Sequence, residues 1–66
     1  MAPMTLKYEP EKTISEPEVI NVFSSFGKLA QVELKGTESA LVTFKRTIHA
    51  LEALHELKFM KITVHQ

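Results

Sequence analysis

Hydrophobic residues along this chain follow two different spacings. They alternate with polar residues over residues 4–8, 29–34, 39–44 and 61–65, a pattern that predicts β-strands. Elsewhere they recur at i, i+3, i+4 and i+7, which predicts helices with one apolar face. The second of these helices is expected over residues 47–57. The helical positions are Val19, Val22, Phe23 and Phe26, followed by Ala50, Ala53, Leu54 and Leu57.

The first helix has clear signals at both of its ends. Ser15 and Glu18 have the spacing of a capping box, in which the Ser15 hydroxyl accepts from the Glu18 amide and the Glu18 carboxylate reaches back to the Ser15 amide. Ile14 and Val19 stand where a hydrophobic staple closes. Gly27 is expected to end the helix as a residue free to adopt positive φ.

The predicted order is therefore β-α-β-β-α-β. Each helix has one apolar stripe and each strand one apolar face, so the expected fold is α+β, an α/β sandwich of the ferredoxin-like kind. Two helices cover one face of a four-stranded antiparallel sheet over residues 4–66, after a flexible start at residues 1–3. Leu6 and Tyr8 are expected in the core, because a register shifted by one residue buries Lys7 instead, which is costly.

Composition narrows the function classes. The 66 residues contain no cysteine, which excludes disulfide scaffolds, thiolate zinc sites and cysteine nucleophiles. His49 and His55 are expected to be solvated helix residues, so neither metal nor other cofactor is predicted. So short a chain cannot enclose a deep pocket and keep a core, which argues against a self-contained enzyme. Neither a membrane span nor a signal peptide is visible, so an intracellular, monomeric module is expected.

Two stretches carry a family resemblance. Residues 23–29 read Phe-Ser-Ser-Phe-Gly-Lys-Leu and residues 40–44 read Ala-Leu-Val-Thr-Phe. Together with the order of elements, they resemble the RNA recognition motif (RRM). The resemblance implies a module of a larger RNA-processing protein, for example in mRNA splicing, located in the nucleus rather than the cytoplasm. Modules of this family stack bases on aromatic side chains of the sheet.

The chain departs from the family at the stacking positions. Ser39 and Leu41 stand at two of them and Lys7 at the third, so no ring is expected there. Thr37 replaces a basic residue of the octamer motif, and Glu38 lies where basic residues often sit. Each lost stack removes about 1–3 kcal/mol of binding free energy. The net charge of +0 also lacks the basic excess of most nucleic-acid binders.

The bare sheet face remains the candidate RNA site. Two lysines are expected to meet phosphates, Leu41 to lie under a base, and polar side chains to form hydrogen bonds. The candidate RNA-binding residues are Lys7, Gln31, Leu41, Thr43, Lys61 and Thr63. The Lys45–Arg46 pair is a further possible phosphate contact or plain soluble surface. The alternative interpretation is a solvated or protein-covered face, which antiparallel sheets commonly have.

A protein-interaction adaptor that does not bind RNA is the second hypothesis. Ile20 lies off the apolar stripe of the first helix, and an apolar patch forms if it adjoins Ile14 or Ile48. Phe59 is the other candidate contact, because variant RRMs that bind tryptophan-bearing peptides carry Arg-x-Phe in this loop. The arginine is missing here, and a position at the edge of the core is the competing expectation for Phe59.

Overall fold

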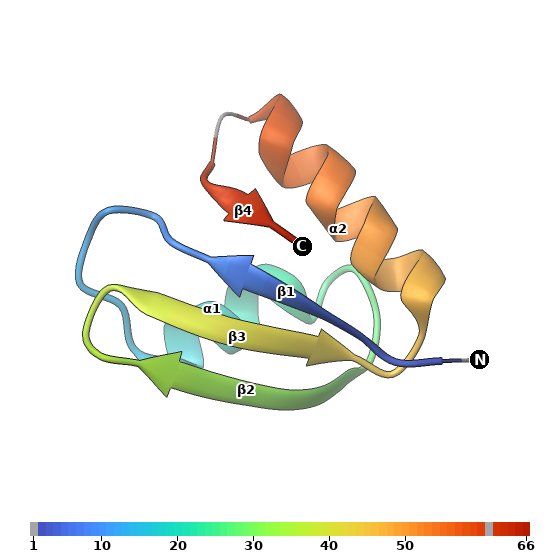
Figure 1. Cartoon of the computed structure of the whole chain (residues 1–66), viewed down its shortest axis with the longest axis horizontal. Helices are drawn as coiled ribbons and strands as arrows, with labels where there is room; N and C mark the ends of the chain where they lie inside the picture. Colours follow the sequence, from blue (N-terminus) through green and yellow to red (C-terminus); the bar gives the residue numbers. More distant parts are fainter. Residues whose placement is uncertain (1, 61) are drawn as a thin grey trace.

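The computed structural model describes residues 2–60 and 62–66. Its elements are β1 (Met4–Tyr8), α1 (Glu16–Phe23), β2 (Leu29–Lys35), β3 (Ser39–Phe44), α2 (Thr47–Phe59) and β4 (Val64–His65). The strands form one antiparallel sheet in the order β2-β3-β1-β4 (Figure 1). The predicted fold class and element order are confirmed. Among the described residues of the predicted strand 61–65, only Val64 and His65 pair with β1, and Lys61 lies outside the described residues.

One hydrophobic core joins both helices to the same face of the sheet. Leu6 and Tyr8 lie in it as predicted, at 0% and 4% exposure. The Phe23 ring of α1 meets the rings of Tyr8 and Phe44 edge-on, with centroids 5.0 and 6.2 Å apart. Burial raises the pKa of Tyr8 above its ordinary value. In Figure 1, α1 lies behind the sheet and α2 runs beside β4.

The irregular spacing of apolar residues in β2 has a structural cause. Leu29 pairs with Phe44 and Gln31 with Thr43, so the register shifts between them and Ala30 has no partner on β3. Such a bulge moves the following side chains by one position. Leu29 and Val32 therefore both contact the core although they are three residues apart, and Gln31 faces the other way, as predicted.

The start of α1 follows the capping signals. The Ser15 hydroxyl accepts from the Glu18 amide at 3.4 Å, and both Ile14 and Val19 are buried, as the staple predicts. The Glu18 carboxylate binds the Lys12 ammonium at 2.8 Å. That bond, with a smaller contribution from the Ser15 amide, lowers the pKa of Glu18.

The predicted reason for a glycine at position 27 is wrong. Helix α1 ends at Phe23 with Ser24 as its C-cap, and Gly27 does not adopt positive φ; among the described glycines only Gly36 does. The need for glycine comes from close packing, because a Cβ at position 27 would lie 2.6 Å from the Cβ of His49 and nearer still to its ring. His49 is therefore half-buried rather than solvated, and its Nδ1 has no partner among the described residues.

Helix α2 is held at its start by the beginning of the chain. Arg46 at the N-cap makes no side-chain cap bond. Instead, the Ala2 carbonyl accepts from the Thr47 amide at 3.1 Å and from the Thr47 hydroxyl at 2.8 Å. At its other end, α2 continues past the predicted residue 57 to Phe59. This extension leaves the Phe59 side chain 81% exposed, so the expectation of a core-edge position is wrong.

Candidate nucleic-acid interface

The sheet face opposite the helices is bare and carries most of the predicted RNA-binding residues. The strand register places Gln31, Thr43 and Thr5 in one row across β2, β3 and β1. The next row contains Glu33, Leu41 and Lys7, and it continues to His65 on β4. The structure thus brings together Lys7, Gln31, Leu41 and Thr43. Thr63 is exposed just before β4, and Lys61 lies outside the described residues.

Leu41 is the apolar centre of this face. It is half-exposed and lies between Lys7 on one neighbouring strand and Glu33 on the other. The aromatic rings lie elsewhere: Tyr8, Phe23 and Phe44 are in the core, Phe26 packs against it, and Phe59 stands at the end of α2. Among the described residues, this face therefore has no phenylalanine or tyrosine ring for base stacking. Its one ring is the His65 imidazole, which is bonded to Glu9, and Leu41 offers only a small apolar surface.

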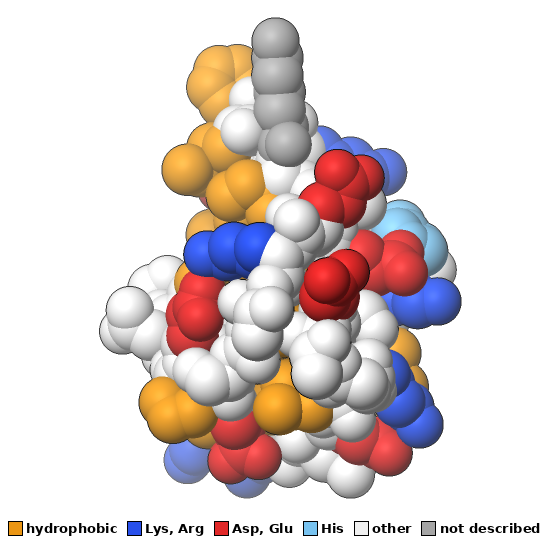
Figure 2. Space-filling model, turned by 90° about the vertical axis from the view of Figure 1, so that its left-hand side faces the viewer, with side chains coloured by type: hydrophobic (Ala, Val, Ile, Leu, Met, Phe, Trp, Pro, Cys, Tyr) orange, Lys and Arg blue, Asp and Glu red, His pale blue; other side chains and the backbone are white. Residues whose placement is uncertain are grey.

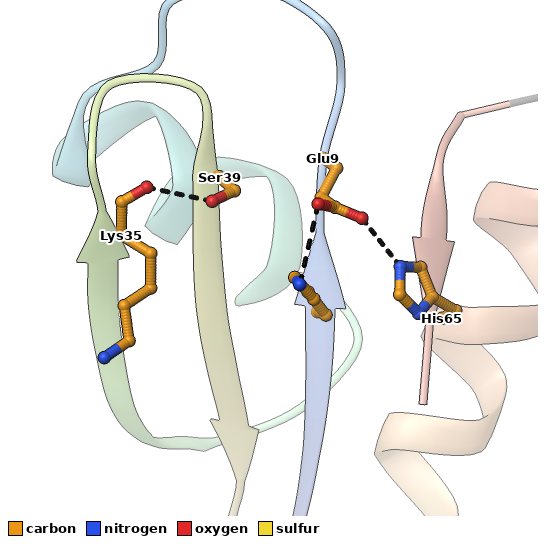
Figure 3. A network of polar contacts seen from close by, with 5 residues as sticks. Glu9, Lys35, Ser39 and His65 are labelled. Carbon is orange, nitrogen blue, oxygen red and sulfur yellow. Dashed lines mark hydrogen bonds and ion pairs between the residues drawn. The ribbon is translucent and has the colours of Figure 1, made fainter.

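Two lysines of the open face form ion pairs with glutamates, and Figure 3 shows the contacts of Glu9. Lys7 Nζ lies 3.7 Å from one carboxylate oxygen of Glu9, whose other oxygen accepts from His65 Nε2 at 2.7 Å. Lys35 Nζ lies 3.2 Å from a carboxylate oxygen of Glu33. Thr5 and Thr43 share a hydrogen bond of 2.8 Å. These contacts compete with RNA for Lys7 and Thr43.

The network around Glu9 makes stability depend on pH. The hydrogen bond from His65, helped by the charge of Lys7, lowers the pKa of Glu9 below its ordinary value. A lowered pKa in the fold means that the ionised form stabilises it, and this contribution disappears as the pH falls below about 4.3. We expect the stability difference between the parent and Glu9→Gln to shrink on acidification. Urea unfolding at neutral and acidic pH measures it.

Glu11→Gln is the matched control for this prediction. Glu11 is exposed on the same loop and takes part in no ion pair between described residues. Its variant should follow the parent at each pH. If parent and Glu9→Gln lose stability in parallel, the Glu9 network contributes nothing to the fold.

One end of the open face is acidic. A hollow of about 440 Å³ lies between the loop after β1 and the β2–β3 turn, and its lining includes Glu9, Glu11 and Glu38 with Lys35. This end of the molecule is the one seen in Figure 2, where acidic and basic side chains alternate over the surface. Three carboxylates around one hollow disfavour a phosphate there.

The opposite end of the sheet is basic. The Lys45 amide donates to the Lys28 carbonyl at 3.0 Å, so these two residues are neighbours, and Arg46 follows directly. All three side chains are exposed, and none of the ion pairs between described residues involves them. Sequence reasoning found Lys45 and Arg46 but missed Lys28, because its proximity depends on the register of β2 against β3.

The predicted protein-contact residues lie apart from one another. Ile20 is 39% exposed on α1, but its expected neighbour Ile14 is buried at 6% exposure. Ile48 is exposed on α2. Phe59 and Met60 are 81% and 62% exposed at the end of α2, where Figure 2 shows hydrophobic side chains near the top of the molecule. Ile20 instead lines a groove between α1 and β2.

Comparisons with known proteins identified no relative of this chain. This chain matches no protein-family model, no curated protein and no solved structure. Within residues 2–60 and 62–66, no group of three or more potential ligands is arranged to hold a metal ion. No helix in this part of the chain has the length and apolar character needed to cross a membrane. The function must therefore be argued from the fold and its surfaces.

Proposed function

We propose that this chain is a non-catalytic, RRM-type binding module of a larger RNA-processing protein, and that its open sheet face binds single-stranded RNA weakly. One observation carries the proposal: the bare face ends in Lys28, Lys45 and Arg46, whose charges are not used in ion pairs among the described residues. Phosphates bind at this basic end. Bases lie over Leu41, where Gln31 and Thr43 form hydrogen bonds with them.

Weak affinity follows from the same surface. Base stacking on aromatic rings is worth about 1–3 kcal/mol per base, and the one ring on the described part of this face is the His65 imidazole, which is bonded to Glu9. Contacts to phosphate therefore supply most of the binding free energy, with little dependence on RNA sequence. Lys7 contributes less than predicted, because it is paired with Glu9. The acidic hollow beyond Leu41 limits how far the RNA strand extends toward the β2–β3 turn.

Charge reversal at the basic end tests this proposal. We expect Lys45→Glu to weaken binding of a labelled oligouridine, and to make the negative slope of log affinity against log salt less steep by about 0.7 for the lost contact. Fluorescence anisotropy at several salt concentrations measures both. The matched control is Lys58→Glu, which makes the same charge change on the last turn of α2. Equal losses in both variants would show that only net charge matters and that the basic end is not the site.

Leu41→Glu tests the centre of the face separately. It places a carboxylate beside Lys7 and Glu33, where the proposal puts a base. RNA affinity should fall, and in the parent protein the amide resonances of Leu41 and Thr43 should shift on RNA addition. Unchanged affinity would exclude the sheet as an RNA platform.

A protein-interaction adaptor is the second proposed function. The observation that favours it is the exposure of large apolar side chains away from the sheet face, among them Ile20 in a groove beside β2. If RNA causes no shifts on the sheet at about millimolar concentration, a range where only very weak binding is missed, the adaptor is the better proposal.

A further inference from the structure

An apolar groove runs along the outer edge of the sheet, between α1 and β2. We call it the edge groove. It has a volume of about 610 Å³, and its lining includes Ile20 from α1 and Leu29, Ala30 and Val32 from β2. Helix α1 does not cover this strand fully. The inward side chains of β3 are 0% exposed, whereas those of β2 are half-buried or, at Leu34, 36% exposed.

The backbone beside the edge groove is free to pair. Strand β2 has seven residues and pairs only with β3, so its outer side presents unpaired donors and acceptors. A free edge of this kind accepts an added strand from an extended peptide. The bulge places the small side chain of Ala30 in the groove lining, which leaves room for a larger side chain of a partner.

The groove has an opposite charge at each end. Strands β1 and β2 are both antiparallel to β3, so they run parallel to each other, and α1 returns between them in the opposite direction. Glu16 at the start of α1 therefore lies toward the carboxyl end of β2, and Lys28 lies at its amino end. Both residues belong to the groove lining. The helix between the two ends rises about 12 Å.

These features define the chemistry of the occupant. An extended peptide covers about 12 Å in roughly four residues, and alternate side chains point to the same side. Paired antiparallel to β2, the slightly more stable arrangement, the peptide begins near Glu16 and ends near Lys28. Its groove-facing side chains are then a basic residue, an apolar residue in the middle, and an acidic residue.

We propose that the edge groove binds a short extended segment of a protein partner, with a basic, a large apolar and an acidic residue at alternate positions in that order. This inference rests on the second proposed function, contact with protein. The free strand edge supplies backbone pairing, Ile20 and Val32 hold the apolar side chain, and Glu16 and Lys28 set the direction of the peptide.

A designed peptide provides the probe. The capped heptapeptide Ser-Lys-Thr-Phe-Thr-Asp-Ser carries the three side chains in the proposed order, and Ser-Asp-Thr-Phe-Thr-Lys-Ser reverses the charges. We expect the first to shift the amide resonances of Ile20, Ala30 and Val32 of the isotope-labelled chain. The reversed peptide should bind at least about tenfold more weakly, because each end then meets a like charge.

Variants of the chain complete the test. The double variant Glu16→Lys, Lys28→Glu should reverse the preference between the two peptides, since a repulsive contact becomes attractive at each end. Ile20→Lys should abolish binding; its side chain is already partly exposed, so the variant is expected to stay folded. Leu41→Glu, on the open face, should bind as the parent does.

The outcomes separate this inference from the proposed functions. Binding in the groove with equal affinity for both peptides overturns the charge order but leaves protein contact standing. Shifts elsewhere, or none at about millimolar peptide, overturn the inference and remove the groove as support for an adaptor. RNA binding is judged independently, from shifts of Leu41 and Thr43 on the other face.

Discussion

We expect Phe23→Ala to unfold this domain. The ring is 0% exposed and meets both Tyr8 and Phe44 edge-on, so it joins α1 to two strands of the sheet. Removing a buried phenylalanine ring costs about 3–5 kcal/mol, through lost burial and the cavity left behind. A single core of this size rarely supplies more than about 3–5 kcal/mol in total. We expect circular dichroism of the variant to show a largely unfolded chain at room temperature.

Phe59→Ala is the matched control for this result. It makes the same substitution, but at a ring that is 81% exposed at the end of α2. Its unfolding free energy should stay within about 0.5 kcal/mol of the parent, as is usual for surface positions. A Phe23→Ala variant that melts together with Phe59→Ala would mean that Phe23 does not hold the core together.

Gly27→Ala has the second largest expected effect. Its new methyl group would lie 2.6 Å from the Cβ of His49, so either the turn after α1 or the start of α2 must move. Overpacking of this kind costs about 1–3 kcal/mol. Urea denaturation should show a lower midpoint with an unchanged slope, because the fold stays the same while its stability falls.

A double-mutant cycle identifies the cause of that loss. His49→Gly removes both the Cβ and the ring that meet position 27, so the loss caused by Gly27→Ala should be much smaller in that background. Gly36→Ala is the contrast: nothing lies within 4 Å of its added carbon, but its φ of 72° strains any other residue. His49→Gly should not rescue Gly36→Ala. Equal rescue of both glycine variants would contradict direct contact between positions 27 and 49.

Most of the fold could be predicted because the apolar spacings are strong. The alternation in β1 and β3 and the helical spacing of Val19 and Phe23 each leave one workable orientation toward the core. The errors arose where contacts between residues distant in the sequence determine the local structure. The reason for Gly27 lies in His49, which belongs to another element, and the shortness of β4 depends on how few of its residues reach β1.

Less of the candidate site than of the fold could be predicted from the sequence. Period-two alternation placed Lys7, Gln31, Leu41 and Thr43 on one face, and the strand register brings them together. Alternation cannot show that Lys7 and His65 meet at Glu9, because the partners come from opposite ends of the chain. The edge groove could not be predicted from the sequence either. Ile20 was found as an unexplained apolar residue, but its partners depend on how α1 crosses β2.

Because β4 is short, we expect it to be less stable locally than the other strands of the sheet. Among the described residues, only Val64 and His65 pair with β1. Beside them the Glu9 amide donates to the Thr63 carbonyl at 3.0 Å, and the side-chain bond from His65 to Glu9 lies at the surface. Proteins open locally where few contacts hold a segment, well below the free energy of global unfolding. Release of β4 alone would uncover the second edge of β1, so we expect the amide protons of β4 to exchange with solvent faster than those of β3.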